Sequence, residues 1–385
     1  MRYVQINEYS HGWAESIVFG KHRELLEEGV ESYVFWGRGR NPENDWEMRI
    51  TTLPEVCIDA ALTRVDGRAG FHSHGATKRL LSKLDDIDPD VVHLHVLHGY
   101  YLNIEMLFDW LASHRCDVIW TLHDCWPFTG HCQYFTAAEC DEWKTGCSGR
   151  LPCPQTSSYP QTYNKRNVAR NYCEKKRLFT SIPPSRMRLI VPSNWLAGLV
   201  RESFLSKYQV SVVRNKVDLS VFKPTPSDFR ERYGIGNRFL ILGVANAWTE
   251  RKGLSDFVQL ARDLDPDKYA IVLIGLNAGQ IRRLGNLIIG IERTRSAKEL
   301  AEAYTAADVL FNPTKEDNYP TVNLEAQSCG TAVGTYRTGG SPETLFLEES
   351  FVCSDLNCFI QKCHEMSLRG FSICRSSSAV VEDFK

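Results

Sequence analysis

The chain has 385 residues, of which 43% are hydrophobic and 24% charged, and its formal net charge is −2. This length favours two domains that each bury a core, and the balanced charge argues against a general nucleic-acid binder. No uncharged apolar run approaches the ~20 residues of a membrane helix, and the N-terminus lacks the apolar core of a secretory signal. We therefore expect a soluble, cytoplasmic protein.

The first 36 residues predict a βαβ unit. It comprises a strand at 2–6, a helix at 14–28 and a second strand at 32–36. Strands and helices go on alternating, which indicates a parallel sheet with helices on both faces. In such sheets ligands bind beyond the carboxyl ends of the strands. The turn that contains Gly12 therefore lies on the substrate side. No G-x-G-x-x-G follows the first strand, which disfavours dinucleotide binding.

The histidines gather in the first half, where ten of the eleven lie at or before position 131. His93 alternates with apolar residues, so we expect it in the core. For His95 and His98, just beyond the same predicted strand, a cleft role and a structural role stay equally open. His123 follows the next strand and is the stronger candidate, because its neighbour Asp124 could orient the ring and raise its basicity.

A cysteine-rich insertion is expected at about residues 124–155. Its cysteines are eight, seven and six positions apart: Cys132, Cys140, Cys147 and Cys153. Four thiolates on loops are a ligand set for structural zinc, although the close C-x2-C pairs of zinc knuckles are absent. The alternative is four reduced thiols in an insertion packed by Trp and Phe. The chain's thirteen scattered cysteines do not suggest a disulfide scaffold.

Residues 161–190 carry eight Lys and Arg against a single acid, Glu174, with a long basic helix predicted at 161–180. Such a face is usually no more than solvated. The alternative is a surface that rests on anionic lipid, where each basic residue contributes about 1 kcal/mol. That alternative places the protein peripherally at the inner face of the membrane.

A second run of alternating strands and helices follows an interdomain segment, which divides the chain into domains of residues 1–215 and 216–385. The loop after the strand at 239–244 carries Arg251 and Lys252. Two cations beside a diphosphate would offset the charge that builds on it as a leaving group.

The most informative stretch contains two carboxylates eight positions apart, Asp317 and Glu325. Pro320 predicts a helix start between them, so Asp317 lies in the loop before the helix and Glu325 on its second turn. The amides of Thr321 and Val322 then have no intrahelical carbonyl partner. A free helix N-terminus holds phosphate, and a carboxylate a turn further on can bind a ribose diol. The pattern favours a sugar nucleotide.

This spacing resembles the Glu-x7-Glu signature of retaining GT-B glycosyltransferases of the family-4 type. HVLHGYYLN (95–103), DNYP (317–320) and the pattern HD-x-W-x-x-T-G-x-C…C-x-x-W-x-x-G-C…CP are similar to the colanic acid biosynthesis group of exopolysaccharide glycosyltransferases. The resemblance implies a GT-B fold: two doubly wound, Rossmann-like α/β domains facing a cleft. The first would hold the acceptor and the second the nucleotide sugar.

The resemblance also implies residue roles. His123 and Asp317 would flank the transferred sugar as catalytic residues. The donor would be bound by Arg251, Lys252, Asn318, Tyr319, Pro320, Thr321, Val322 and Glu325. The acceptor side would comprise Gly12, His95, His98 and Asp124. No cofactor is required, because Lys and Arg take the place of a metal cation.

The implied reaction transfers a sugar, with retention, from a UDP- or GDP-linked donor to a saccharide in bacterial exopolysaccharide or surface polysaccharide synthesis. A lipid-linked acceptor would account for a membrane contact. Two other classes stay open. A nucleotide-sugar epimerase would make its product from the donor alone, and a non-catalytic carbohydrate-binding assembly protein would bind the donor weakly or not at all.

Overall fold

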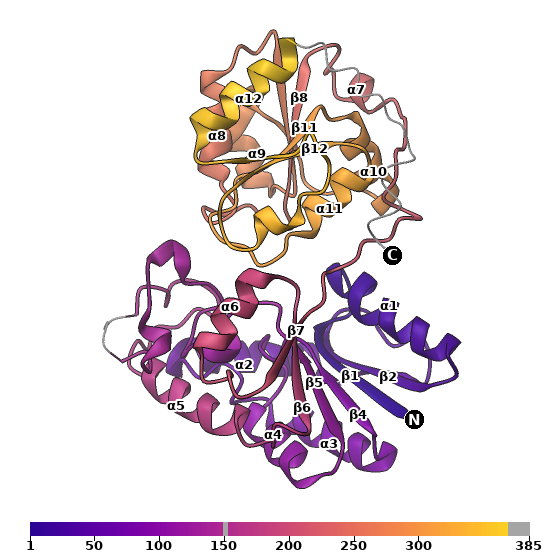
Figure 1. Cartoon of the computed structure of the whole chain (residues 1–385), viewed down its shortest axis with the longest axis vertical. Coiled ribbons are helices and arrows are strands. Elements are labelled where there is room, and N and C mark those ends of the chain that lie inside the picture. Colours follow the sequence, from indigo (N-terminus) through magenta and orange to yellow (C-terminus); the bar gives the residue numbers. More distant parts are fainter. Residues whose placement is uncertain (149–152, 369–385) are drawn as a thin grey trace. The chain divides into compact units, whose positions relative to one another are not determined.

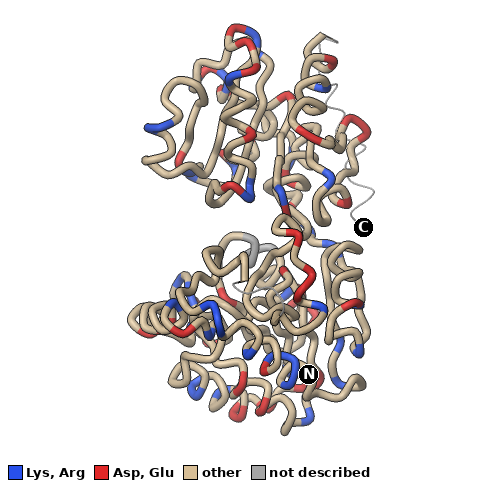
Figure 2. The backbone as a smooth tube through the Cα atoms, turned by 90° about the vertical axis from the view of Figure 1, so that its left-hand side faces the viewer, with Lys and Arg blue, Asp and Glu red and all other residues tan. Residues whose placement is uncertain are grey.

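The computed structural model describes residues 1–148 and 153–368, and the chain divides into two compact units between Arg214 and Asn215 (Figure 1). Lysines and arginines are interspersed with acidic residues along both units (Figure 2), as the small net charge leads one to expect. Among the described residues, no helix is both long and apolar enough to cross a membrane.

The N-terminal unit is built on a sheet that, within the described residues, has seven parallel strands in the order β3-β2-β1-β4-β5-β6-β7. The strands are β1 (Arg2–Tyr9), β2 (Glu31–Arg38), β3 (Glu47–Arg49), β4 (Val91–Leu94), β5 (Asp117–Thr121), β6 (Met187–Val191) and β7 (Gln209–Val212). The helices are α1 (Trp13–Glu27), α2 (Leu53–Asp66), α3 (His74–Ile87), α4 (Ile104–Ser113), α5 (Val168–Phe179) and α6 (Asn194–Glu202). Short 3-10 helices lie at Trp126–Phe128, Thr136–Ala138 and Glu142–Lys144.

The two faces of this sheet carry different helices. On one face Val4 and Ile6 of β1 belong to a core that α3, α4 and α5 complete. On the other face α1 packs Val18 and Phe19 against β2. The strand order reverses between β1 and β4, whose register pairs residue 6 with residue 94. The residues just after these strands therefore share the edge where open sheets bind ligands.

The C-terminal unit holds a parallel sheet, six-stranded within its described residues, in the order β10-β9-β8-β11-β12-β13. The strands are β8 (Phe239–Val244), β9 (Tyr269–Ile274), β10 (Ile289–Ile291), β11 (Val309–Asn312), β12 (Ala332–Tyr336) and β13 (Phe351–Cys353). The helices are α7 (Phe229–Arg232), α8 (Leu254–Asp263), α9 (Ala278–Leu284), α10 (Ala297–Ala306), α11 (Thr321–Ser328) and α12 (Leu356–Leu368), with 3-10 turns at Gly285–Leu287 and Ser341–Thr344.

Helices cover both faces of this second sheet as well. One core contains Phe257 of α8 and Phe359 of α12, and the other contains Tyr304 of α10 and Ala326 of α11. Figure 1 shows these two helix pairs on opposite sides of the strands. The strands are buried along most of their length, as parallel strands covered on both faces are. The prediction of two Rossmann-like α/β domains is confirmed.

Two details differ from expectation. The basic helix predicted at 161–180 is shorter, because α5 begins only at Val168. The sequence analysis also made no prediction for residues 40–87, where the structure has β3, α2 and α3.

Candidate functional site

The C-terminal unit brings the predicted cations and the first carboxylate together. Arg251 and Lys252 follow β8 and Asp317 follows the neighbouring strand β11, so parallel pairing places all three at one sheet edge. Lys252 Nζ lies 2.6 Å from Asp317 Oδ2, and Arg251 Nη1 lies 4.0 Å from the same oxygen. Burial alone would raise the pKa of Asp317, but the two cations outweigh it and the pKa is lowered.

A glycine fixes the position of Asp317. Gly339 has a left-handed φ of +56°, and a Cβ added to it would lie 2.0 Å from the Asp317 carbonyl oxygen. The next amide, of Gly340, donates a 3.0 Å hydrogen bond to that oxygen. Because any side chain at residue 339 would collide with backbone and would strain the turn, the loop depends on glycine there.

Glu325 lies eight residues after Asp317, on the second turn of α11. Its Oε2 accepts a 2.8 Å hydrogen bond from the Tyr304 hydroxyl. Burial raises the pKa of Glu325, although the hydroxyls of Tyr304 and Thr321 lower it in part. The side chain is half-buried, so it is oriented on one side and accessible on the other.

The loop between the two carboxylates is well packed. Asn318, Tyr319 and Pro320 are buried, and Thr321 and Val322 form the half-buried first turn of α11. Asp317 Oδ1 accepts the backbone N–H of Asn318 at 2.9 Å. All of the predicted donor-binding residues therefore lie in this loop, on α11, or in the loop after β8.

Buried amides that the sequence analysis did not single out hold α11 in place. Asn323 Oδ1 accepts a 2.8 Å hydrogen bond from Asn312, and its Nδ2 donates to the Thr344 hydroxyl at 2.8 Å. Gln327 Oε1 accepts the backbone N–H of Phe346 at 2.7 Å. The sequence signal for these two amides was the presence of polar residues on the buried side of a short helix.

In the N-terminal unit, three histidines form a row, of which His93 and His95 are buried and His123 is half-buried. The rings of His93 and His95 lie 4.2 Å apart, and His95 Nδ1 is 3.3 Å from His123 Nε2. His93 also contacts the hydroxyls of Tyr3 and Thr121 at 2.8 Å, so the core prediction for His93 is confirmed. Burial lowers the pKa of His93 to about 3 and that of His123 to about 4. These imidazoles are neutral at physiological pH.

Asp124 makes a different contact from the one predicted. Its Oδ2 lies 2.8 Å from His98 Nε2 and accepts a 2.9 Å hydrogen bond from Gln133, and its Oδ1 accepts the Trp126 amide at 2.9 Å. Asp124 does raise the pKa of His123, as predicted, but burial lowers that pKa by more, so the net shift is downward.

Three further residues surround His98. Glu8, at the end of β1, forms an ion pair with Arg38, at the end of β2, and its other oxygen lies 3.9 Å from His98 Nδ1. The Tyr159 hydroxyl lies 3.3 Å from the same nitrogen. The sequence analysis missed these three, although Glu8 and Arg38 end strands at the ligand-binding edge. Gly12 lies exposed at the start of α1, with φ of +68°.

Two family profiles match the two units of the chain. The sequence profile described as "Glycosyltransferase Family 4" matches residues 14–221, and that of "Glycosyl transferases group 1" matches residues 238–367. The chain belongs to glycosyltransferase family 4. The recognition made from the sequence is therefore confirmed, and the protein is a glycosyltransferase.

Two curated relatives show the extent of the similarity. The glycosyltransferase is 26% identical to a protein of Escherichia coli K12 assigned as the colanic acid biosynthesis glycosyl transferase WcaC, over 90% of this chain and 85% of that protein. It is 30% identical to a D-inositol 3-phosphate glycosyltransferase of Corynebacterium jeikeium, over 34% of this chain and 36% of that one.

Solved structures share the fold. Sucrose-phosphate synthase from Thermosynechococcus elongatus matches with a TM-score of 0.68 at 14% identity, over 99% of this chain and 92% of that one. Anabaena HepE in complex with UDP matches with a TM-score of 0.61 at 13% identity, over 99% and 93% of the two chains. The predicted GT-B class is confirmed.

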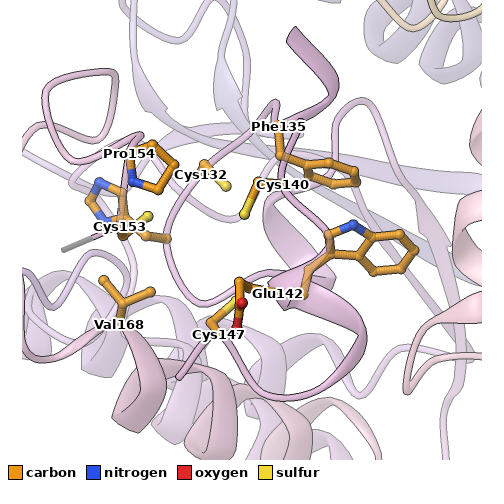
Figure 3. Close-up of a pocket in the computed structure, with 10 residues that line it drawn as sticks. Cys132, Phe135, Cys140, Glu142, Cys147, Cys153, Pro154 and Val168 are labelled. Carbon is orange, nitrogen blue, oxygen red and sulfur yellow. The ribbon is translucent and has the colours of Figure 1, made fainter. Parts of the chain in front are cut away.

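The four cysteines of the insertion line one small cavity of the glycosyltransferase. Figure 3 shows Cys132, Cys140, Cys147 and Cys153 around this space with Glu142, Phe135 and Val168. His131 also lines it; the ring is 2% exposed and neither of its nitrogens has a hydrogen-bond partner. Within the described ranges, however, no group of three or more His, Cys, Asp or Glu side chains is arranged to hold a metal ion. As they stand, the four cysteines match the alternative of reduced thiols, and zinc binding stays a prediction.

The predicted basic surface is less uniform than its composition suggests. Lys175 is 1% exposed and donates a 2.6 Å hydrogen bond to the Trp126 carbonyl. Arg170 pairs with Glu174, and Arg177 pairs with Glu105. Much of the positive charge of residues 161–190 is therefore buried or neutralised.

Proposed function

We propose that this glycosyltransferase transfers a sugar from a nucleoside-diphosphate donor to a saccharide hydroxyl. One observation carries the proposal: Lys252 and Arg251 meet Asp317 at the sheet edge just before α11, and Glu325 stands on the second turn of that helix. Cations and a helix N-terminus suit a diphosphate, and an accessible carboxylate suits a diol.

In the proposed complex, Lys252, Arg251 and the amides of Thr321 and Val322 hold the diphosphate. Without a ligand, Lys252 is paired with Asp317, and a diphosphate would share that cation. Positive charge from side chains does the work that a metal ion does elsewhere. We therefore expect transfer to persist in excess EDTA, and complete loss that added Mg²⁺ or Mn²⁺ restores would contradict this part of the proposal.

Glu325 is proposed to bind the ribose, with Tyr304 orienting it, while Asp317 and Asn318 contact the donor sugar. His123 of the N-terminal unit is proposed to hydrogen-bond a sugar hydroxyl. A neutral His123 can hydrogen-bond a hydroxyl without adding charge. We propose transfer with retention, in which the leaving phosphate takes the proton of the attacking hydroxyl. The reaction then needs no nucleophile from the protein, and both carboxylates keep their binding roles.

The acceptor is proposed to bind in the N-terminal unit. The linked pairs of Asp124 with His98 and of Glu8 with Arg38 offer several donors and acceptors to a polyol. The similarity to the colanic acid biosynthesis protein supports a role in exopolysaccharide or surface polysaccharide synthesis. We propose a lipid-linked saccharide as the acceptor. The solved HepE complex contains UDP; UDP- and GDP-linked donors are both consistent with the residues here.

The test measures nucleotide release from a panel of UDP- and GDP-sugars, with and without a lipid-linked saccharide. Release that requires acceptor supports transfer. A new sugar nucleotide formed from donor alone would identify an epimerase, and absence of donor binding would favour a non-catalytic assembly protein. Glu325→Ala should lose donor affinity while keeping its thermal unfolding profile. Glu348→Ala, which removes an exposed carboxylate of the same unit, is the matched control.

For the cysteine cavity, we propose that Cys132, Cys140, Cys147 and Cys153 would hold a structural zinc ion. Its support is the shared cavity, the unpartnered His131 ring beside it and the Gly130 amide, which donates to Cys147 Sγ at 3.3 Å. Elemental analysis of protein purified without chelator should show about one zinc per chain, and Cys140→Ser should lose it. Zinc well below stoichiometry would reject the centre.

A further inference from the structure

Helix α2 turns an apolar face toward solvent. Leu53, Ile58, Leu62 and Val65 are 74%, 59%, 45% and 69% exposed. The last three are four and then three positions apart, so they share one side of the helix. A helix that covers a sheet normally buries such a stripe, whereas the buried residues of α2 are Val56, Asp59 and Thr63.

Tyr163, 73% exposed, extends this surface. Its backbone N–H donates a 2.8 Å hydrogen bond to the Arg64 carbonyl, and the Asn167 side chain donates to the Asp66 carbonyl at 2.7 Å. The segment before α5 is therefore tied to the C-terminal end of α2. We name the α2 patch by its members: Leu53, Ile58, Leu62, Val65 and Tyr163. Among the described residues, these are five of the eleven exposed large hydrophobic side chains.

The charges beside the patch are mostly unbalanced cations. Arg64, Lys165 and Arg166 are exposed, and none has an ion-pair partner in the part of the chain that is described. The neighbouring acids are engaged, since Glu55 pairs with Arg79 and Asp66 lies 3.2 Å from His72. Exposed apolar side chains with free cations beside them are the pattern of a helix that lies in the interface of an anionic bilayer.

We propose that the α2 patch is the surface through which this protein rests on an anionic lipid bilayer, with Ile58, Leu62, Val65 and Tyr163 entering the interface and the three free cations contacting the headgroups. The positive charge beside the patch distinguishes a lipid surface from a second copy of the chain. A second copy of the chain would bring the same unpaired cations to face these, unless it docked elsewhere, whereas anionic headgroups neutralise them.

The patch also lies close to the proposed acceptor side. Tyr159, whose hydroxyl contacts His98, precedes Tyr163 by four residues, which span at most ~14 Å. A saccharide carried on a lipid in that bilayer could therefore reach the residues around His98. The lipid contact itself does not depend on the proposed reaction, because vesicle binding is measured without donor or acceptor.

The experiment is co-sedimentation with vesicles of phosphatidylcholine containing 30% phosphatidylglycerol, compared with phosphatidylcholine alone. The wild-type chain should bind the anionic vesicles at least tenfold more tightly and lose binding in high salt. The triple variant Ile58→Ser, Leu62→Ser, Val65→Ser and the triple variant Arg64→Gln, Lys165→Gln, Arg166→Gln should each weaken binding at least tenfold. Their thermal unfolding should be unchanged, because all six side chains are exposed.

The matched control is Val213→Ser with Leu287→Ser, which removes two exposed hydrophobic side chains elsewhere (53% and 43% exposed). It should bind vesicles like the wild type. Equal binding by the α2 variants, or binding lost equally in the control, would overturn the proposal. So would a dimer in light scattering that dissociates on the Ser substitutions without any vesicle binding, since the patch would then join two copies of the chain.

Discussion

The polar groups at the ligand-binding edges of the two units differ in charge. In the C-terminal unit, Asp317 and Lys252 form an ionised, partly buried pair on loops at one sheet edge, just before α11. In the N-terminal unit, a row of histidines is kept neutral by burial, and Glu8, whose pKa burial raises, is paired with Arg38. Two sheets of the same construction thus carry different electrostatics.

The difference follows the ligands that the two units are proposed to hold. A diphosphate keeps its charge at every physiological pH, so its site needs fixed cations. A saccharide hydroxyl is neutral and is recognised through hydrogen-bond geometry, which buried and mutually oriented side chains provide. Substitutions in the two units should therefore have separable effects.

The largest effect is expected from Lys252→Ala in the C-terminal unit. Removing the cation leaves Asp317 with only Arg251 at 4.0 Å, so the carboxylate would repel the diphosphate. We expect transfer to fall by about 10²–10³-fold, as when a charge-stabilising donor is removed elsewhere, with donor affinity measured by calorimetry falling too. Lys252→Arg should retain part of the activity.

Lys362→Ala is the control for charge, since Lys362 pairs with Glu365 on the far end of α12. It should leave transfer unchanged. A Lys252→Ala variant with normal donor affinity would show that the Asp317–Lys252 pair serves only the fold.

The next effect is expected from Asp124→Asn in the N-terminal unit. The neutral amide cannot accept a charge-assisted hydrogen bond from His98, and one of its N–H groups would face a donor. We expect kcat/KM for the acceptor to fall by about 10–100-fold, in line with the 1.5–3 kcal/mol of such bonds, with donor affinity unchanged. Asp117→Asn, at the exposed start of β5, is the matched control. If donor affinity fell as well, the two units would not bind their ligands independently.

More of the C-terminal site than of the N-terminal one could be predicted from the sequence, because the C-terminal residues are close together along the chain. Asp317, the helix start and Glu325 lie within nine consecutive residues, so spacing and helix geometry alone place them. The group around His98 is instead drawn from residues 8, 38, 124, 133 and 159. Each of these is a lone polar residue in sequence, and only the sheet order brings them together.

The net pKa shift of His123 was likewise beyond reasoning from neighbouring residues in the sequence. Asp124 raises that pKa, but its Oδ2 also lies 2.8 Å from Nε2 of His98, which is 26 positions away in the sequence. Burial, which the sequence does not quantify, then sets the sign of the pKa shift. Likewise α2 escaped prediction, because its apolar residues mark the outward side of the helix and not the core.

The buried histidines predict that the N-terminal unit is the more acid-sensitive one. The pKa of His123 is about 4 in the folded chain and about 6.5 when unfolded. The unfolded state therefore gains protons first as pH falls below 6.5, and stability is lost down to pH 4. From pH 7 to pH 5, the lowered pKa of His123 alone reduces the free energy of unfolding by about 2 kcal/mol. The effects of the nearby Asp124 and His98 on His123 are already part of that pKa.

Tryptophan fluorescence can follow this loss separately, because eight of the nine tryptophans precede residue 215 and the ninth is Trp248. Guanidinium unfolding of Trp248→Phe should shift to lower denaturant at pH 5. Between pH 7 and pH 5, the free energy of unfolding should fall by about 2 kcal/mol less in His123→Gln than in the chain that keeps His123. A midpoint that stays the same between pH 7 and pH 5 would show that the histidine row is protonated in the folded protein.

The smallest effect is expected from Tyr304→Phe, which removes one hydroxyl from Glu325 and leaves the carboxylate in place. A single hydrogen bond of this kind contributes about 0.5–1.5 kcal/mol, so donor affinity should fall about 3–10-fold. Since burial already raises the pKa of Glu325 and this hydroxyl lowers it, the variant's pKa should rise further. Its donor affinity should then be lost at a higher pH than that of the wild type as the solution is acidified.

Tyr336→Phe separates this effect from a general loss of a buried hydroxyl, because Tyr336 donates a 3.0 Å hydrogen bond to Asp256 in the same unit, away from α11. It should change stability by a similar amount and leave the affinity–pH profile unmoved. If both variants shift the profile alike, donor affinity responds to the overall stability of the unit. If only Tyr304→Phe shifts it, the pH at which the donor is released reports the ionisation of Glu325. The carboxylate on α11 is then the group that binds the nucleotide.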